Sequence, residues 1–90
     1  MKYSGHALRQ MFARRISGRE IRDVISLQDI VKDYPQDNPY PSRLLLGRPG
    51  DRPIHVVLAY NAETGEGLVI TVYEPDSALW ETDFRSRRSK

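Results

Sequence analysis

Two histidines are the residues of this 90-residue chain whose ordinary pKa lies close to neutral pH. His6 lies in the segment SGHALRQMFARR, and His55 lies in the segment PIHVVLAY. Histidine takes up or releases a proton at neutral pH, and arginine binds phosphate through a rigid fork of donors. The two histidines and the arginines near them are therefore the first candidates for chemistry, provided that the fold positions them together.

The segment that carries His55, residues 53–60, has the strict alternation of a half-buried β-strand. A second strand is predicted over residues 67–75, where β-branched and aromatic residues dominate. The turn NAETGEG separates the two segments, so together they predict an antiparallel hairpin.

A symmetric hairpin pairs His55 with Tyr73 and Val57 with Thr71 on one face of the sheet. We expect this less apolar face to be open and the opposite face to pack against helices. The remaining expected positions are Ala59 opposite Val69 on the open face, and Ile54, Val56, Leu58 and Tyr60 against Leu68, Ile70, Val72 and Glu74 on the covered face.

His6 falls in a predicted helix over residues 4–15, in which Ser4 is the N-cap. Leu8, Met11 and Phe12 recur at helical spacing and predict its apolar face. Spacing by four residues places a polar stripe roughly opposite that face. The stripe consists of His6, Gln10 and Arg14.

A second helix is predicted to start at Ser17, because Ser17 and Glu20 have the spacing of a capping box. It runs to about Leu27. Segments 29–34 and 43–47 are predicted to be short strands, the first of them at an edge of the sheet.

The C-terminal segment is predicted to form a short helix capped by Asp76 or Ser77, with Trp80 and Phe84 one turn apart, and then a frayed tail. The expected fold is therefore a single α+β domain over residues 1–90. An N-terminal two-helix hairpin packs on a three- to four-stranded antiparallel sheet, and a short helix ends the chain.

Composition narrows the classes of function. The chain has no cysteine, which excludes disulfides and thiolate zinc sites and fits a reducing cytoplasm. No apolar run has the length of a membrane span, and the first ten residues lack the apolar core of a secretory signal. The net charge is +2, with arginines crowded near both ends of the chain. Two interpretations stay open: the basic ends bind a polyanion or an acidic protein, or they are ordinary solvated surface charges.

Cleavage of RNA without a metal needs the residue types found here. It requires a base for the 2′-hydroxyl proton, an acid for the leaving oxygen and a cation for the phosphate. His6 and His55 are the candidate acid and base, Arg14 is the candidate phosphate ligand, and Tyr73 is a candidate to stack on a base or donate to the phosphate. No close pair of histidines or of histidine and aspartate favours a metal site, and no cofactor is expected.

Each candidate also has a structural interpretation, and both interpretations stay open at this point. For His6 the structural interpretation is a hydrogen bond to a loop, and for His55 it is a satisfied histidine within the sheet. For Tyr73 it is packing, and for Arg14 it is an ion pair with Glu20 or Asp23.

Several short motifs spread over almost the whole chain resemble a known family. They are S-x-H-A (Ser4, His6, Ala7), Met11, R-x-I-S (Arg14 to Ser17), D-V (Asp23, Val24), Y-P (Tyr34, Pro35), H-V-V (His55 to Val57) and T-V-Y-x-P-D (Thr71 to Asp76). The family is a small bacterial one of unknown function, grouped with the RelE-like toxin fold. Its members are similar to mRNA interferases of the RelE and MqsR kind, and they often pair with a small zinc-finger antitoxin of the MqsA type.

The resemblance implies a cytoplasmic, RNA-cleaving or ribosome-associated protein with a cognate antitoxin. Its motif positions fall on His6, Arg14, His55, Thr71 and Tyr73. One departure concerns the arginine that the family carries just before the methionine of the first helix. Gln10 stands there in this chain, and Arg9 is one residue earlier, a rotation of about 100° around the helix.

Two functions are therefore predicted. The first is a toxin that acts as a metal-independent endoribonuclease by 2′-hydroxyl attack. Its catalytic residues are His6, His55 and Tyr73, and its substrate-binding residues are Arg14, Gln10, Thr71 and Arg9. The alternative is a non-catalytic module of the same fold that binds RNA, the ribosome or a protein.

Overall fold

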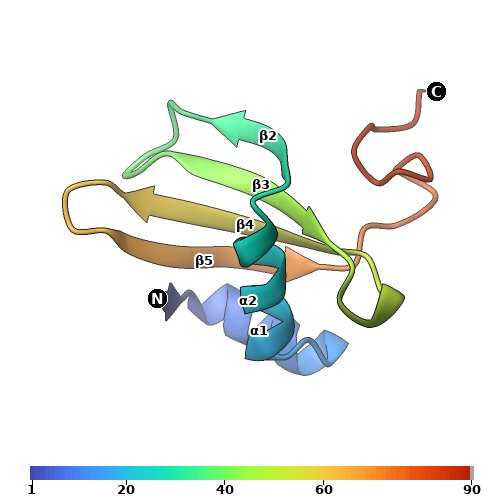
Figure 1. Cartoon of the computed structure of the whole chain (residues 1–90), viewed down its shortest axis with the longest axis horizontal. Coiled ribbons are helices and arrows are strands. Elements are labelled where there is room, and N and C mark those ends of the chain that lie inside the picture. The colour runs from blue at the N-terminus through green and yellow to red at the C-terminus, as the bar shows by residue number, and fades with distance from the viewer. Residues whose placement is uncertain (90) are drawn as a thin grey trace.

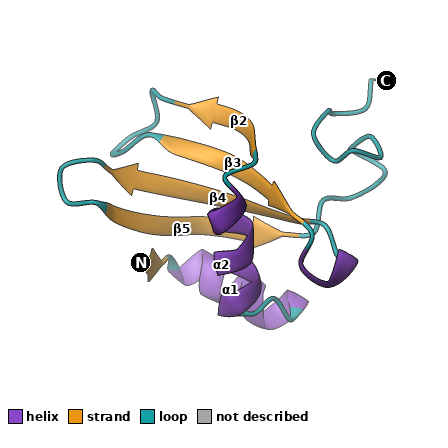
Figure 2. Cartoon of the chain, in the orientation of Figure 1, coloured by secondary structure: helices purple, strands orange, loops and turns teal. Residues whose placement is uncertain are grey.

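Two helices pack on a five-stranded mixed sheet in the computed structural model, which describes residues 1–89 (Figures 1 and 2). The predicted α+β class is confirmed. No helix within these residues is long and apolar enough to cross a membrane. The sheet order is β1-β5-β4-β3-β2. In chain order the elements are β1 (Lys2–Tyr3), α1 (Gly5–Arg14), α2 (Gly18–Leu27), β2 (Ile30–Tyr34), β3 (Ser42–Gly47), the 3₁₀ turn η1 (Pro49–Asp51), β4 (Ile54–Asn61) and β5 (Glu66–Tyr73).

Both helices start where their capping residues predict. The Ser4 hydroxyl accepts a hydrogen bond from the Ala7 amide at 2.9 Å. At α2, the Glu20 amide donates to the Ser17 hydroxyl at 3.1 Å, and the Ser17 amide donates to the Glu20 carboxylate at 2.9 Å. These local bonds satisfy amide groups that a helix start otherwise leaves unpaired.

The core lies between the helices and one face of the sheet. Ala7 of α1 joins Ile21 and Val24 of α2 against the central strands. Gly47 of β3 lets α2 approach closely, because a β-carbon there would lie 2.8 Å from a methyl group of Val24. The sheet side of this core consists of Leu45, Ile54, Val56, Val69 and Val72.

The predicted apolar face of α1 is wrong. The helix buries Ala7 completely and Met11 in part, whereas Leu8 is 52% exposed and Phe12 is 90% exposed. Helical spacing shows which side chains of α1 share a face, but it does not show which face packs on the sheet. The face that carries Ala7 packs on β5, because its small side chain allows the helix to approach the strand closely.

The β4–β5 hairpin confirms the predicted pairing near His55 and departs from it further along. His55 lies opposite Tyr73, and Val57 lies opposite Thr71. A register shift follows, so Ala59 lies opposite Leu68 rather than Val69. A bulge adds a residue to one strand, which reverses the alternation beyond it. Val69 and Val72 therefore both enter the core although they are three residues apart.

The sheet has one strand more than predicted, and it is not purely antiparallel. Lys2 and Tyr3 form β1, which runs parallel to β5 along its outer edge. The two-residue strand is too short to produce a periodic sequence signal. The predicted strands over 29–34 and 43–47 are confirmed as β2 and β3.

The predicted C-terminal helix is wrong. Residues 76–89, which we call the C-terminal strap, form consecutive turns with one bridge between Trp80 and Arg87 (Figure 2). The predicted fraying is also wrong for the described residues, because Arg88 donates to the Ser77 carbonyl at 2.7 Å and pairs with Glu81 at 2.9 Å. Lys90, the last residue of the predicted tail, lies outside the described residues.

Candidate functional site

His55 is completely enclosed, although the sheet face on which it lies is not covered by the helices. Its ring has edge contacts with Tyr73, at 5.2 Å between centroids, and with Trp80, at 4.6 Å. Trp80 belongs to the C-terminal strap, which therefore covers the face that we expected to be open. The exposed fraction of His55 is 0%.

Both ring nitrogens of His55 have protein partners. Nε2 lies 2.8 Å from the Phe84 carbonyl oxygen, which can only accept, so Nε2 carries the proton and donates it. In the neutral ring Nδ1 then accepts from the Tyr73 hydroxyl at 3.2 Å. Burial lowers the pKa of His55 and raises the pKa of Tyr73, which keeps both groups uncharged at neutral pH.

His6 lies in a different environment, at the surface and in the first turn of α1. Its Nε2 is 3.0 Å from the Thr71 hydroxyl of β5. The N-cap Ser4 fixes this end of the helix against the same strand by donating to the Ile70 carbonyl at 2.6 Å. The structure therefore brings His6 and Thr71 together, a contact that no sequence pattern required.

The two histidines contact β5 residues that are two positions apart, since Thr71 binds His6 and Tyr73 binds His55. Only His6 is open to a ligand. The acid/base roles of His6, His55 and Tyr73 stay predictions, and a substrate cannot reach His55 while the strap is in place.

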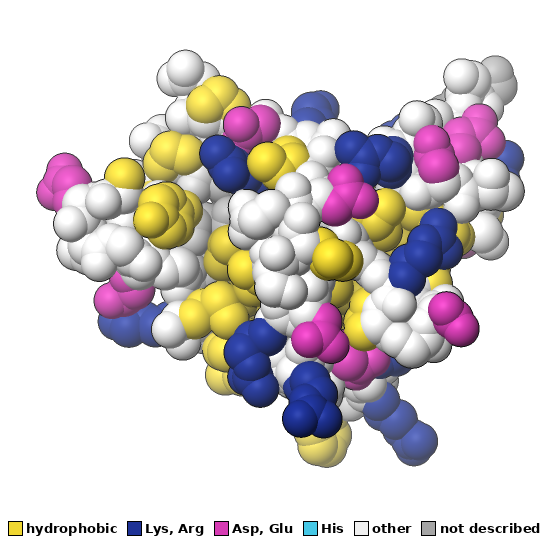
Figure 3. All heavy atoms as spheres, viewed as in Figure 1, with side chains coloured by type: hydrophobic (Ala, Val, Ile, Leu, Met, Phe, Trp, Pro, Cys, Tyr) yellow, Lys and Arg dark blue, Asp and Glu magenta, His cyan; other side chains and the backbone are white. Residues whose placement is uncertain are grey.

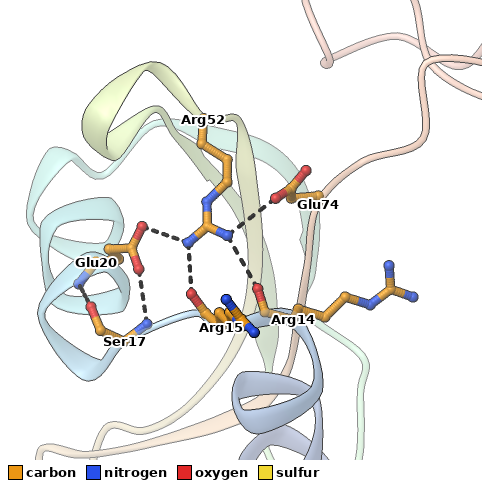
Figure 4. Close-up of polar contacts among 6 residues, drawn as sticks. All are labelled: Arg14, Arg15, Ser17, Glu20, Arg52 and Glu74. Atoms are coloured by element: carbon orange, nitrogen blue, oxygen red, sulfur yellow. Dashed lines mark hydrogen bonds and ion pairs between the residues drawn. The ribbon is translucent and has the colours of Figure 1, made fainter.

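The three predicted substrate-binding side chains of α1 lie at or near the surface of the helix. Arg9 and Arg14 are exposed, and Gln10 is half-buried. The expected ion pair between Arg14 and Glu20 or Asp23 is not formed, and Figure 4 shows the Arg14 side chain pointing away from Glu20. Within residues 1–89, Arg14 has no acidic partner.

The outer surface of the two helices is strongly basic. We call this the helix-layer arginine surface, and in Figure 3 dark-blue side chains gather along the lower side of the molecule, where the helices lie. All its arginines are exposed, and none has an ion pair within residues 1–89. The surface consists of Arg9, Arg14, Arg15, Arg19 and Arg22.

The predicted basic C-terminal end is largely neutralised in the described part of the chain. Arg85 forms an ion pair with Asp29, and Arg88 pairs with Glu81. Arg87 lies over the Trp80 ring at 5.2 Å. Most of the arginines without an acidic partner in residues 1–89 therefore lie on the helices, although Arg87 of the strap also has none.

A second polar cluster, which no sequence pattern indicated, is centred on Arg52 (Figure 4). One nitrogen of its guanidinium donates to the Arg14 carbonyl at 3.1 Å and to Glu74 at 3.2 Å. The other donates to the Arg15 carbonyl at 3.0 Å and to Glu20 at 2.7 Å. No spacing rule connects these positions, since Arg52 and Glu20 are 32 residues apart.

The Arg52 cluster is structural rather than catalytic. It ties the end of α1, the start of α2 and the end of β5 to the segment before β4. The Ser17 amide, and after it the Arg52 guanidinium, hold the pKa of Glu20 below its ordinary value. All four hydrogen bonds of the cluster go to groups of the protein, which leaves little capacity for a substrate.

The structure also has an open groove of about 1090 Å³ on the part of the sheet beyond α2. Tyr40, Leu58 and Tyr60 contribute apolar surface to it, and Asp33 and Arg43 form an ion pair within it. Neither histidine lines this groove, so it is separate from the His6 site.

The architecture defines a small α+β protein in which two helices cover one face of a mixed sheet. Its sequence places it in a family: the chain belongs to the family described as Domain of unknown function (DUF4258), whose model matches residues 3–74. This segment includes both histidines and ends before the C-terminal strap begins. No curated protein and no solved structure matches the chain.

Replacing Arg52 with alanine should lower the free energy of unfolding by about 2 kcal/mol, because charge-assisted hydrogen bonds to four partners are removed together. Arg52→Lys should recover only part of this stability, since an ammonium group lacks the planar fork. Urea unfolding measures both effects. Arg43→Ala is the matched control, because its pair with Asp33 is exposed and should contribute less than about 1 kcal/mol. Equal destabilisation by the two alanine variants would contradict the structural role.

Stability should also depend on pH through His55. Burial lowers its folded-state pKa, so below about pH 6.5 the unfolded chain binds a proton that the folded protein excludes. The free energy of unfolding should be nearly constant from about one pH unit above this value. As the pH is lowered below it, the free energy of unfolding should fall by up to about 1.4 kcal/mol per pH unit until the pH passes the folded-state pKa of His55.

Urea unfolding at pH values between about 5.5 and about 7.5 measures this slope, and His55→Asn should remove it. His6→Gln is the surface control and should retain it. A His55→Asn variant with the wild-type slope would show that other groups cause the pH dependence.

Proposed function

We propose that this protein binds RNA through the helix-layer arginine surface. The observation that carries the proposal is the concentration of five exposed arginines without acidic partners in residues 1–89. Residues 5–27 contain two carboxylates, and one of them, Glu20, is already held by Arg52. The helices therefore carry an excess of positive charge that the fold itself does not use.

Guanidinium groups suit a phosphate backbone because they donate two parallel hydrogen bonds and keep their charge at any physiological pH. Displacement of counterions from the nucleic acid supplies further free energy. The resemblance to mRNA interferases of the RelE and MqsR kind favours RNA as the polyanion. The same resemblance supports a cytoplasmic setting and a small zinc-finger antitoxin as a protein partner.

Neutralising two arginines of α1 and the arginine that follows it should weaken RNA binding and reduce its salt dependence. The variant is Arg9→Gln/Arg14→Gln/Arg15→Gln, which leaves the carbonyl groups that bind Arg52 in place. The slope of log affinity against log salt should fall in magnitude by about 0.7 for each phosphate that the variant no longer neutralises. Fluorescence anisotropy with a labelled RNA at several salt concentrations measures it.

The matched control removes the same amount of charge from residues that already have acidic partners. It is Lys2→Gln/Arg43→Gln/Arg88→Gln. This control should keep most of the wild-type affinity. If both triple variants weaken binding equally, the net charge of the protein and not the helix surface determines binding, and the proposal fails.

A second candidate function is metal-independent RNA cleavage, and the exposed His6–Thr71 pair favours it. Thr71 orients the imidazole, and Arg9 and Gln10 extend from the same helix. In this reaction a base removes the 2′-hydroxyl proton, the 2′-oxygen attacks phosphorus and the 5′-oxygen leaves with a proton. His6 is the histidine that can supply one of these proton transfers at the surface.

RNA incubated with the protein in the presence of a chelator tests this candidate. His6→Ala should reduce cleavage by about 100-fold or more and leave RNA affinity nearly unchanged, because general acid–base catalysis contributes to the reaction and not to binding. Growth arrest on expression, relieved by a zinc-finger protein, would accompany an active toxin. If purified wild-type protein binds RNA without cleaving it, the non-catalytic alternative is correct.

A further inference from the structure

The most exposed large apolar side chain lies on the basic helix. Phe12 is 90% exposed, whereas Trp80 of the strap is buried and Phe84 of the strap is partly buried. The helix does not need Phe12 for packing, because Ala7 and Met11 already form its contact with the core. An aromatic ring is therefore presented to solvent from the last turns of α1.

Arginines surround this ring. Arg9 lies three residues before Phe12 and is its neighbour on the helix surface, and Arg15 lines the same surface depression as Phe12. Arg15 ends the helix in a left-handed conformation, with φ of 54°. Helix α1 contains no acidic residue, so the charged side chains that this helix offers to an approaching anionic group are all basic.

The surface beside Phe12 is a shallow, open depression rather than an enclosed cavity. An open hollow of about 690 Å³ lies between the end of α1 and the start of α2. Its walls offer both apolar surface and one guanidinium group. They are formed by Met11, Phe12, Ala13, Arg15, Ile16 and Ser17.

We infer that Phe12 is a base-stacking residue and that the surface around it binds single-stranded RNA, with Arg9 and Arg15 contacting the adjacent phosphates. Aromatic rings set in a positively charged groove bind single strands in this manner, because every base has a face that can stack. In an RNA duplex the bases are paired and stacked inside the double helix, so none of them can stack on the Phe12 ring. The inference rests on the proposed RNA binding and specifies the class of RNA.

A protein partner would also cover an exposed phenylalanine, yet the charges favour RNA. A protein would have to bring several carboxylates to match the neighbouring arginines, in addition to an apolar pocket for the ring. A single strand supplies a phosphate for every base at regular spacing. One ligand therefore matches both the ring and the charges around it.

Fluorescence anisotropy with a labelled single-stranded RNA and with a duplex of the same sequence tests the inference. Phe12→Leu keeps an apolar side chain and removes the aromatic face. It should weaken single-strand binding by about 5- to 150-fold and leave duplex binding and the salt slope unchanged. Phe12→Trp should retain or strengthen single-strand binding.

Tyr60→Leu is the matched control, because Tyr60 is an exposed aromatic residue that lines the separate groove on the sheet. It should leave single-strand affinity at the wild-type value. Unchanged single-strand binding by Phe12→Leu, or an equal weakening for single strand and duplex, overturns the inference while RNA binding itself stands. A wild-type protein that binds neither RNA overturns the proposed function as well.

Sedimentation of the protein without RNA tests the remaining explanation, which is that Phe12 contacts a second protein chain instead of an RNA base. The inference expects a monomer whose state does not depend on Phe12. If the wild-type protein self-associates and Phe12→Leu dissociates it, the ring contacts another protein chain, and the stacking role is wrong.

Discussion

The arrangement of this protein depends on one guanidinium group. Arg52 binds the last carbonyls of α1, the capping carboxylate of α2 and the carboxylate that follows β5. Helix ends leave carbonyl groups without partners inside the helix, and a charged donor is well suited to satisfy them. Since Arg52 comes just before β4, the same contact fixes the α1–α2 junction relative to the centre of the sheet.

The two sides of the molecule have different properties. On the helix side, the small Ala7 allows α1 to lie against β5, and the larger side chains Leu8 and Phe12 remain outside with the arginines. On the other side, the C-terminal strap encloses His55 between Tyr73 and Trp80. One histidine is therefore available at a basic surface, and the other stabilises the attachment of the strap.

The division also bears on activity. His55 has a fully satisfied, neutral hydrogen-bond arrangement, which is what a buried imidazole requires to avoid a large desolvation cost. The surface of α1 combines an oriented histidine, unpaired arginines and an exposed aromatic ring. Under the proposed function, residues of the helices therefore bind the ligand, whereas the sheet and the strap hold the helices and the C-terminal segment in place.

The local parts of this structure follow from short spacings in the sequence. Ser4, Ser17 and Glu20 predicted both helix starts. The alternation around His55 predicted its strand, and the symmetry of the hairpin predicted its pairing with Tyr73. The prediction was wrong where a distant contact decided the outcome. The bulge after Val57 moved Val69 into the core, and Trp80 joined a strap over His55 instead of a helix.

Short spacings in the sequence specify the helix caps, the strand alternation around His55 and the concentration of arginine in the first quarter of the chain. These features depend on residues only a few positions apart, where the geometry of a helix or strand leaves little freedom. The symmetry of the hairpin turn adds the pairing of His55 with Tyr73. The folded structure decides instead that Ala7 and not Phe12 faces the core, that Arg52 joins the helix ends, and that His55 is enclosed while His6 is open. Those outcomes depend on packing and desolvation between segments far apart in the chain, which spacing alone cannot specify.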